Sequence, residues 1–228
     1  MATLENADVP DGCPANSGEY HSWLNLTDQA ALRCYKNMYS RVYFNGTYSM
    51  AGGVSIYGKD FGGVEGVDNL AANVDVPVFR VMIEALEALG YQRGVNLHGA
   101  PYDFTFAGYH YDTPESGYFQ ALTGLIEETY MRNNNTQVHL LGHSMGTVML
   151  HYFLTTRDAG WKNTHVASYI PIAPVFYGCP FATRALITGI TNGDFNKWFL
   201  RNLIRGWGSV HWFIPSPRWT PKVFSPRN

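Results

Sequence analysis

The chain has 228 residues, of which 46% are apolar and 15% are charged, and its formal net charge is −2 at pH 7. This length and apolar content suffice for the core of one domain, or most of one, and we expect no second domain. The near-neutral charge argues against the basic surface that binds nucleic acid, so we expect no nucleic-acid partner.

The first 66 residues are rich in Gly, Tyr and Asn and predict a cap or excursion ahead of the core, with one short helix near residues 26–35. No basic segment followed by an apolar stretch opens the chain, and no later stretch approaches the ~18 apolar residues of a spanning helix. As written, the chain is therefore expected to be soluble and untargeted. The glycine-rich residues 62–66 lack the lysine and the flanking strand of a phosphate-binding loop and predict a turn.

Helical and strand patterns alternate from there on. Apolar residues at helical spacing predict a helix over residues 77–89, ended by Gly90. A short apolar run at residues 95–97 predicts a strand, and Pro114 introduces a second helix that continues to about residue 130.

Two further strands are predicted at residues 138–141 and 166–173, with a helix at 147–154 between them. Strands that alternate with helices imply a parallel sheet covered on both faces. The last stretch is rich in aromatic side chains, which either floor an apolar substrate site or belong to the core. The proline-spaced end of the chain predicts a loop.

The pentapeptide Gly142-His143-Ser144-Met145-Gly146 has the Gly-x-Ser-x-Gly pattern of a nucleophile elbow. It follows a predicted strand and opens a predicted helix, as that turn requires. The turn would hold Ser144 in a sparsely populated conformation with its hydroxyl above the sheet, and Gly142 and Gly146 would permit the close chain approach. Ser144 would then attack an ester carbonyl, while the backbone N–H of Met145 stabilises the oxyanion.

A serine nucleophile also needs a histidine base and a carboxylate, in the order Ser, Asp/Glu, His in this fold. Asp194 with His211 is the sole pair in that order and in a loop-like context. The alternative is structural: His151 lies on the predicted elbow helix, His165 starts a strand, and His211 sits among aromatic residues.

The sequence has no Cys-x-x-Cys pair and no Walker loop, so we expect neither a metal nor a cofactor. Its cysteines, Cys13, Cys34 and Cys179, settle neither pairing nor compartment. Three Asn-x-Thr sequons favour entry into the secretory pathway. They begin at Asn25, Asn45 and Asn134.

The elbow segment, residues 138–146, resembles the lecithin:cholesterol acyltransferase and lysosomal phospholipase A2 family, as do Tyr152-Phe153-Leu154 and Trp161-Lys162 that follow it. Gly99-Ala100-Pro101-Tyr102-Asp103 matches that family's Ala-Pro-Tyr-Asp motif, which follows a parallel strand. Further matches span nearly the whole chain in order. They are Trp23-Leu24-Asn25-Leu26, Cys34 with Asn37 and Met38, Gly62-Gly63-Val64, and Gly117-Tyr118-Phe119.

The resemblance implies an α/β-hydrolase, with a mostly parallel doubly wound sheet, a lid or cap excursion, and truncation at both ends. Residues 1–66 would form the lid and a connecting segment, and residues 67–228 a partial core of the same domain. By the same resemblance Cys13 and Cys34 form the disulfide that closes the lid, and Trp23 lies within that lid. Asn45 falls where family members bear a sequon, and Asn25 is the second glycosylation candidate.

The resemblance also implies a function. Ser144 would be the acyl-enzyme nucleophile, and Met145 would supply an oxyanion amide. The enzyme would take an acyl chain from a phospholipid and pass it to an alcohol or water, without a cofactor. It would act in the secretory pathway, in a lysosomal, vacuolar or extracellular compartment, with transient contact to a membrane or lipoprotein surface.

Two departures and one shortfall qualify that expectation. Phe104-Thr105 stands where the family has Trp-Arg, and residues 173–179 replace its Ala-Pro-Trp-Gly-Gly, which leaves the acyl preference and the acceptor open. The family's second oxyanion donor precedes the lid and its catalytic Asp and His lie beyond residue 228, so this stretch alone is expected to be nearly inactive. The alternative is a catalytically silent, lipid-binding relative.

Overall fold

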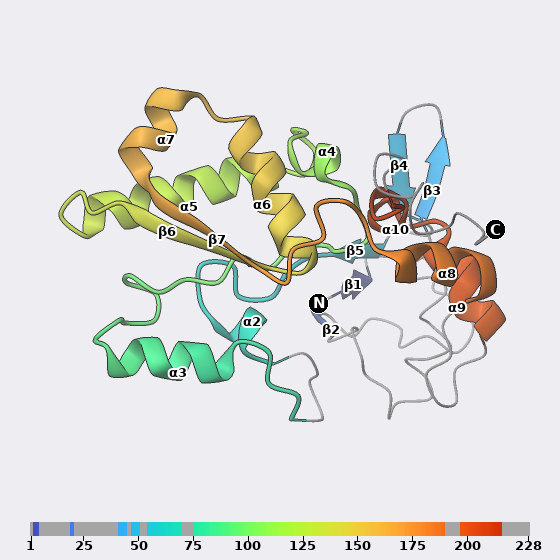
Figure 1. Cartoon of the computed structure of the whole chain (residues 1–228), viewed down its shortest axis with the longest axis horizontal. Helices are drawn as coiled ribbons and strands as arrows, with labels where there is room; N and C mark the ends of the chain where they lie inside the picture. The colour runs from blue at the N-terminus through green and yellow to red at the C-terminus, as the bar shows by residue number, and fades with distance from the viewer. Residues whose placement is uncertain are drawn as a thin grey trace, which may run out of the picture. The chain divides into compact units, whose positions relative to one another are not determined.

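A computed structural model gives the structure of the protein (Figure 1). It describes residues 57–69, 75–189 and 201–215 in full, together with the backbone of short strands before residue 57 and of helical residues 197–200. The chain divides into two compact units, Met1–Asp103 and Phe104–Asn228. The expected division at residue 66, between a lid segment and a partial core, stays a prediction.

Short antiparallel strands occupy the leading part of the first unit. β1 (Ala2–Leu4) lies between β2 (Glu19–Tyr20) and β5 (Val54–Ile56), and β3 (Arg41–Phe44) pairs with β4 (Thr47–Met50). The helix expected near residues 26–35 lies outside the described residues.

The helix predicted over residues 77–89 is confirmed as α3 (Arg80–Ala88), which follows the single turn α2 (Glu65–Asp68). It begins later than predicted because the amides of Val78 and Phe79 donate to the carbonyls of α2. It ends as predicted, since Gly90 has φ +98° and its N–H donates to the Glu87 carbonyl, 2.9 Å away.

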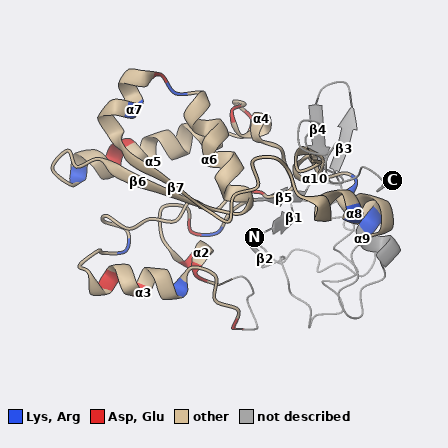
Figure 2. Ribbon diagram, in the orientation of Figure 1, with Lys and Arg blue, Asp and Glu red and all other residues tan. Residues whose placement is uncertain are grey.

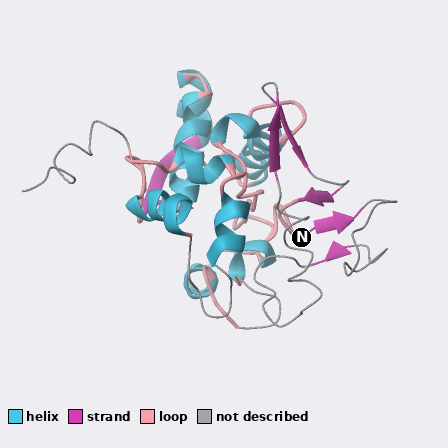
Figure 3. Ribbon diagram, turned by 90° about the vertical axis from the view of Figure 1, so that its right-hand side faces the viewer, coloured by secondary structure: helices cyan, strands magenta, loops and turns pink. Residues whose placement is uncertain are grey.

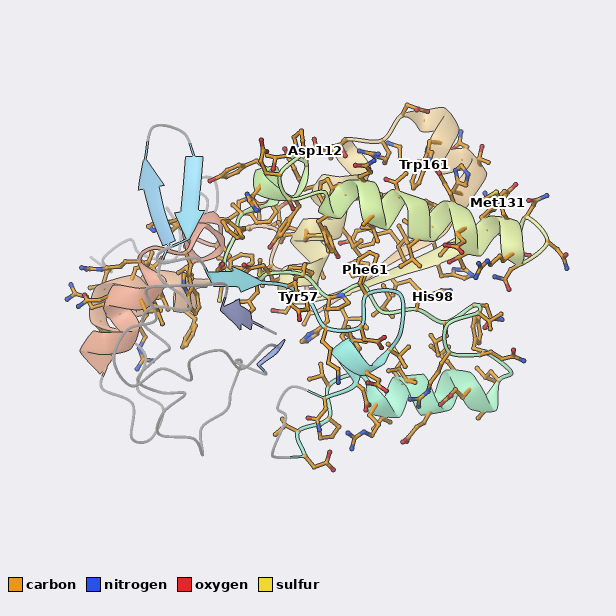
Figure 4. The ribbon with its side chains drawn as sticks, turned by 180° about the vertical axis from the view of Figure 1, so that it is seen from behind. Tyr57, Phe61, His98, Asp112, Met131 and Trp161 are labelled. Atoms are coloured by element: carbon orange, nitrogen blue, oxygen red, sulfur yellow. The ribbon has the colours of Figure 1, made fainter. Side chains whose placement is uncertain are left out.

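The glycine-rich turn is confirmed at residues 62–64, whereas Glu65 and Gly66 already belong to α2. The turn packs against the segment before the Ala-Pro-Tyr-Asp motif. The N–H of Gly62 donates to the Gly99 carbonyl at 2.8 Å, and the N–H of Gly99 donates back to Gly63 at 2.5 Å. The ring of His98 adds a contact from Nδ1 to the Gly62 carbonyl at 2.7 Å (Figure 4). A Cβ on Gly66 would lie 1.9 Å from the Lys59 carbonyl oxygen, so only glycine fits that approach.

The strand predicted at residues 95–97 is wrong: this segment is a turn. The amides of Val95, Asn96 and Leu97 all donate to the Gln92 carbonyl at 3.1 Å, and the segment makes one isolated bridge, between Arg93 and Leu97. Amides that turn back on a nearby carbonyl are not available to a neighbouring strand. Two apolar residues, Val95 and Leu97, on either side of Asn96 are too short a signal to distinguish these outcomes.

The second unit carries the parallel sheet. β6 (Val138–His143) pairs in parallel with β7 (Val166–Ile172), which confirms both predicted strands. The register sets Leu140 opposite Tyr169 and His143 opposite Ile172. Neither strand contains Lys, Arg, Asp or Glu (Figure 2), which is the composition typical of parallel strands.

Helices make up most of the rest of this unit (Figure 3). They are α4 (Gly108–Tyr111), α5 (Tyr118–Arg132), α6 (Met145–Thr155), α7 (Ala159–His165), α8 (Pro180–Thr188), α9 (Lys197–Ile204) and α10 (Gly208–Trp212). Two of them, α5 and α6, are the helices that the sequence predicts. Helices α5, α6 and α7 lie on the same side of β6 and β7 (Figure 1).

The core of this unit lies between that sheet face and the helices. Phe153 of α6 is fully buried and meets Phe119 of α5 edge-on, with ring centroids 5.1 Å apart. Trp161 of α7 also meets the Phe153 ring edge-on, and its Nε1 donates to Glu127 of α5 at 2.8 Å (Figure 4). The aromatic contacts therefore fix α5, α6 and α7 to one another behind the strands.

The fold class is α/β with a small parallel sheet. On β7, Tyr169 points to the α6 side, whereas Ile170 and Ile172 are exposed at 42% and 39%. The doubly wound sheet and the lid stay predictions. No helix in the described parts of the chain is both long enough and apolar enough to cross a membrane.

Candidate active site at the strand–helix turn

Ser144 lies between the last residue of β6 and the first residue of α6, with φ 50° and ψ −114°. A positive φ is uncommon for any residue with a Cβ, and this combination suits glycine best. The side chain does not cap α6 and is partly exposed. The hydroxyl is therefore set at the tip of a strained turn, as the Gly-x-Ser-x-Gly pattern predicts.

Hydrogen bonds hold this turn on both sides of Ser144. Its N–H donates to the carbonyl of Ile172, the last residue of β7, at 3.0 Å. Its carbonyl accepts from the hydroxyl of Thr147 at 2.6 Å and from the N–H of Thr147 at 3.1 Å. The Tyr169 hydroxyl in turn donates to the Thr147 carbonyl at 2.5 Å. The strained conformation is thus stabilised by the next strand and by the first turn of α6.

Glycine is required at Gly142 because the chain returns close to itself there. A Cβ at Gly142 would lie 2.7 Å from the carbonyl oxygen of Gly146 and 3.0 Å from the Thr147 nitrogen. Both glycines are buried. The close approach brings the start of α6 directly over the end of β6.

Met145 is the first residue of α6, so its N–H has no acceptor one turn earlier in the helix. The N-terminus of a helix also carries partial positive charge. An anion formed at the carbon attacked by Ser144 would find this amide beside it. The arrangement can therefore supply one oxyanion donor next to one hydroxyl.

No histidine within the described residues is hydrogen-bonded to the Ser144 hydroxyl. His211 lies on α10, where Nε2 contacts the Arg205 carbonyl at 2.8 Å, and Asp194 lies outside the described residues. His165, expected at the start of a strand, is instead the last residue of α7, and its Nδ1 contacts the Trp161 carbonyl at 3.0 Å. His151 is exposed on α6, with its ring 5.4 Å from that of Phe176. Each of these three histidines thus contacts residues near it rather than Ser144.

His139 and His143 lie four residues apart, but both are on β6 rather than on a helix. Four residues of strand span ~13 Å, too far for two ligands of one ion. No group of three or more His, Cys, Asp or Glu side chains within the described residues could hold a metal ion.

Several predicted site residues cannot be placed. Trp23, Cys13, Cys34 and both glycosylation candidates, Asn25 and Asn45, lie outside the described residues. Cys179 is a free thiol at the start of α8.

Thr147 and Tyr169 support the turn, and the sequence analysis did not single them out. Thr147 had a local signal, because a threonine three residues after the serine can donate to its carbonyl. Tyr169 had none, because its contact depends on how β7 registers against β6 and α6.

Comparison with known proteins gives a consistent assignment. A family model described as lecithin:cholesterol acyltransferase matches residues 20–226. A lysosomal phospholipase A and acyltransferase from Bos taurus is 35% identical over 148 residues, covering 63% of this chain and 35% of the relative. The Homo sapiens protein of that name is 32% identical over 173 residues, covering 74% and 40%. A Mus musculus phosphatidylcholine-sterol acyltransferase is 28% identical over 230 aligned positions, covering 97% and 51%.

The chain therefore spans about a third to a half of the length of these relatives. The family implies an α/β-hydrolase fold, which agrees with a parallel strand pair that leads through a strained serine into a helix. Because the family model matches most of its residues, this chain belongs to the lecithin:cholesterol acyltransferase family.

Proposed function

We propose that the whole protein is a lipid O-acyltransferase or phospholipase that works through an acyl-enzyme on Ser144. The observation that carries the proposal is the positive φ of Ser144 at the junction of β6 and α6, held by Ile172 and Thr147. A turn that costs ~1–3 kcal/mol of backbone strain persists where the structure around it over-determines it, and such strain clusters at functional sites.

In the proposed reaction the Ser144 hydroxyl oxygen attacks the carbonyl carbon of a phospholipid acyl ester while a histidine takes its proton. The Met145 N–H donates to the resulting oxyanion, a contact of the kind worth ~3 kcal/mol of transition-state stabilisation. Collapse breaks the ester bond, and the lysophospholipid alcohol leaves with the proton. An acceptor alcohol or water then attacks the acyl-enzyme and regenerates the serine.

The histidine and its carboxylate would come from parts of the whole protein that the described residues do not include. The relatives that match this chain are about two to three times as long as the region they share with it, which leaves room for such residues. The second oxyanion donor and a lid closed by Cys13 and Cys34 belong to the same proposal, as does a doubly wound sheet around β6 and β7.

The proposed substrate class follows from the relatives. Their names include phospholipase A and phosphatidylcholine-sterol acyltransferase, so a glycerophospholipid is the proposed acyl donor. Such a substrate resides in membranes or lipoproteins, so the enzyme would make transient contact with a lipid surface. The word lysosomal in one set of names supports a compartment of the secretory pathway.

A second function is a catalytically silent, lipid-binding protein of the same family. It is favoured by one observation: no histidine in the described residues is hydrogen-bonded to the Ser144 hydroxyl. Such a protein would keep the turn and the lipid contact but form no acyl-enzyme.

A fluorophosphonate ester distinguishes the two, because it reacts with a serine only where a base and an oxyanion site activate it. We expect the full-length protein to form one adduct on Ser144, and Ser144→Ala to lose it. Ser116→Ala, a serine in the loop before α5, is the matched control and should label normally. A folded full-length protein that forms no adduct, and releases no fatty acid from labelled phosphatidylcholine, would reject the enzyme and leave the silent relative.

A further inference from the structure

The connection between α5 and β6 presents four consecutive exposed polar residues to solvent, from Asn134 to Gln137. Asn133 ends α5, and the N–H of Thr136 donates back to its carbonyl at 3.0 Å. Between them Asn134 and Asn135 have φ 55° and 57°. Two successive residues with positive φ, closed by a hydrogen bond across four residues, make a type I′ turn, in which asparagine is favoured.

The side chains of this turn differ in their contacts. Asn133 donates from its amide to the Thr129 carbonyl at 2.7 Å, which ties it to α5. Asn134, Asn135 and Thr136 are exposed, and within the described residues the Asn134 amide has no hydrogen-bond partner. The Asn134 amide nitrogen is therefore free to carry a substituent that extends into water.

Asn134-Asn135-Thr136 is also an N-glycosylation sequon. We infer that Asn134 carries an N-linked oligosaccharide. In this transfer the Asn134 amide nitrogen bonds to the first sugar carbon of an oligosaccharide that is joined to a lipid through a diphosphate. The bond from that carbon to the diphosphate oxygen breaks, the lipid diphosphate leaves, and the amide loses one proton. The inference rests on the proposed function only in requiring that the chain enters the secretory pathway.

The position of this turn relative to Ser144 makes the modification compatible with the proposed chemistry. Asn134 precedes β6, whereas Ser144 follows it, so the two lie at opposite ends of the strand (Figure 1). The six residues of β6 separate them by ~20 Å at ~3.3 Å per residue. Met131, on the last turn of α5, is also exposed and marks this outer end (Figure 4). A glycan on the turn would leave the carboxyl edge of the strands open to a lipid surface.

The test is peptide mapping of the full-length protein, made in eukaryotic secretory cells, after enzymatic release of N-glycans in heavy-oxygen water. Release converts a glycosylated asparagine to aspartate that contains the heavy isotope. We expect the heavy-oxygen label at Asn134. We also expect Asn134→Gln and Thr136→Ala to migrate on a denaturing gel as a protein that carries one glycan fewer than the unchanged chain. Thr136→Ser preserves the sequon and is the matched control that should keep the glycan.

An unlabelled Asn134 peptide would overturn the inference, whether the sequons at Asn25 and Asn45 are occupied or not. Fluorophosphonate labelling of Ser144 separates this failure from failure of the proposed function, because glycan transfer does not depend on an activated serine. Thr136→Ala is expected to label at Ser144 as fast as Thr136→Ser. Slower labelling of the unglycosylated variant at equal folded yield would contradict the position assigned to the glycan.

Discussion

The amide of Ser144 donates to the carbonyl of Ile172 across 3.0 Å, so the last residue of β7 holds the residue that follows β6. The parallel ladder pairs His143 with Ile172 and thus continues by one bond beyond β6, into the turn. The strain at Ser144 is in this way supported by the sheet. Changes at the turn should therefore alter stability and the reactivity of the serine separately.

Replacement of Ser144 by glycine should stabilise the protein while it abolishes labelling. A residue with a Cβ at φ 50° and ψ −114° costs ~1–3 kcal/mol of strain, which glycine removes. Part of this gain is offset, because glycine loses more backbone entropy on folding. We expect Ser144→Gly to raise the free energy of unfolding by ~1 kcal/mol. Urea denaturation measures this, with Ser144→Ala as the control that retains the strain. Equal stability of the two variants would contradict a strained turn.

Gly142→Ala should destabilise the protein, because the added Cβ would lie 2.7 Å from the Gly146 carbonyl oxygen. The atoms that this Cβ would meet, in Gly146 and Thr147, all belong to the backbone. Strand β6 and helix α6 must therefore separate, at a cost of ~1–3 kcal/mol. Gly124→Ala on α5 is the matched control, since nothing lies within 4 Å of its Cβ. That variant should gain up to ~1 kcal/mol of helix propensity. Thermal unfolding of the two proteins should shift in opposite directions.

The elements around Ser144 could be predicted from the sequence because their signals are local. A buried apolar run, a Gly-x-Ser-x-Gly turn and a helical pattern follow one another within residues 138–154, and β6 and α6 occupy that stretch. The start of α3 was predicted less accurately, since the amides of Val78 and Phe79 donate to carbonyls of α2, a contact that helical spacing does not encode.

The remaining parts depend on contacts between distant segments. Residues 95–97 turn back on Gln92, and so short a segment gives no indication of where its amides donate. Tyr169 lies 22 residues after Thr147, and the contact between them depends on the register of β7. The base that takes the proton of Ser144 could not be predicted from local patterns. Chain order alone suggests Asp194 and His211, but His211 contacts the Arg205 carbonyl instead.

Thr147→Val should slow labelling of Ser144 in the full-length protein. The substitution keeps the shape of the buried side chain but removes the hydroxyl that donates to the Ser144 carbonyl at 2.6 Å. Loss of this bond should cost ~1 kcal/mol of stability. If the same energy is lost from the reactive conformation, labelling slows about fivefold to tenfold. Thr147→Ser restores the donor and should recover most of the rate, whereas a purely structural role would lower folded yield without changing the rate per folded molecule.

Tyr169→Phe should remove part of the alkaline sensitivity of the fold. Desolvation by partial burial raises the pKa of Tyr169, whose hydroxyl donates to the Thr147 carbonyl, above its ordinary value. The native state then keeps a proton that the unfolded chain releases, so the stability is fully present below about pH 10 and is lost as the pH rises through the raised pKa.

Urea midpoints at neutral pH and at about pH 10.5 measure this effect. Tyr169→Phe should lose ~1 kcal/mol at neutral pH with the hydrogen bond, and its midpoint should then fall less on going to alkaline pH. Burial also raises the pKa of Tyr102, so some alkaline dependence should remain. Tyr177→Phe, whose side chain is exposed, is the control and should leave both midpoints unchanged. An alkaline loss in Tyr169→Phe as steep as that of the unchanged protein would remove Tyr169 as its source.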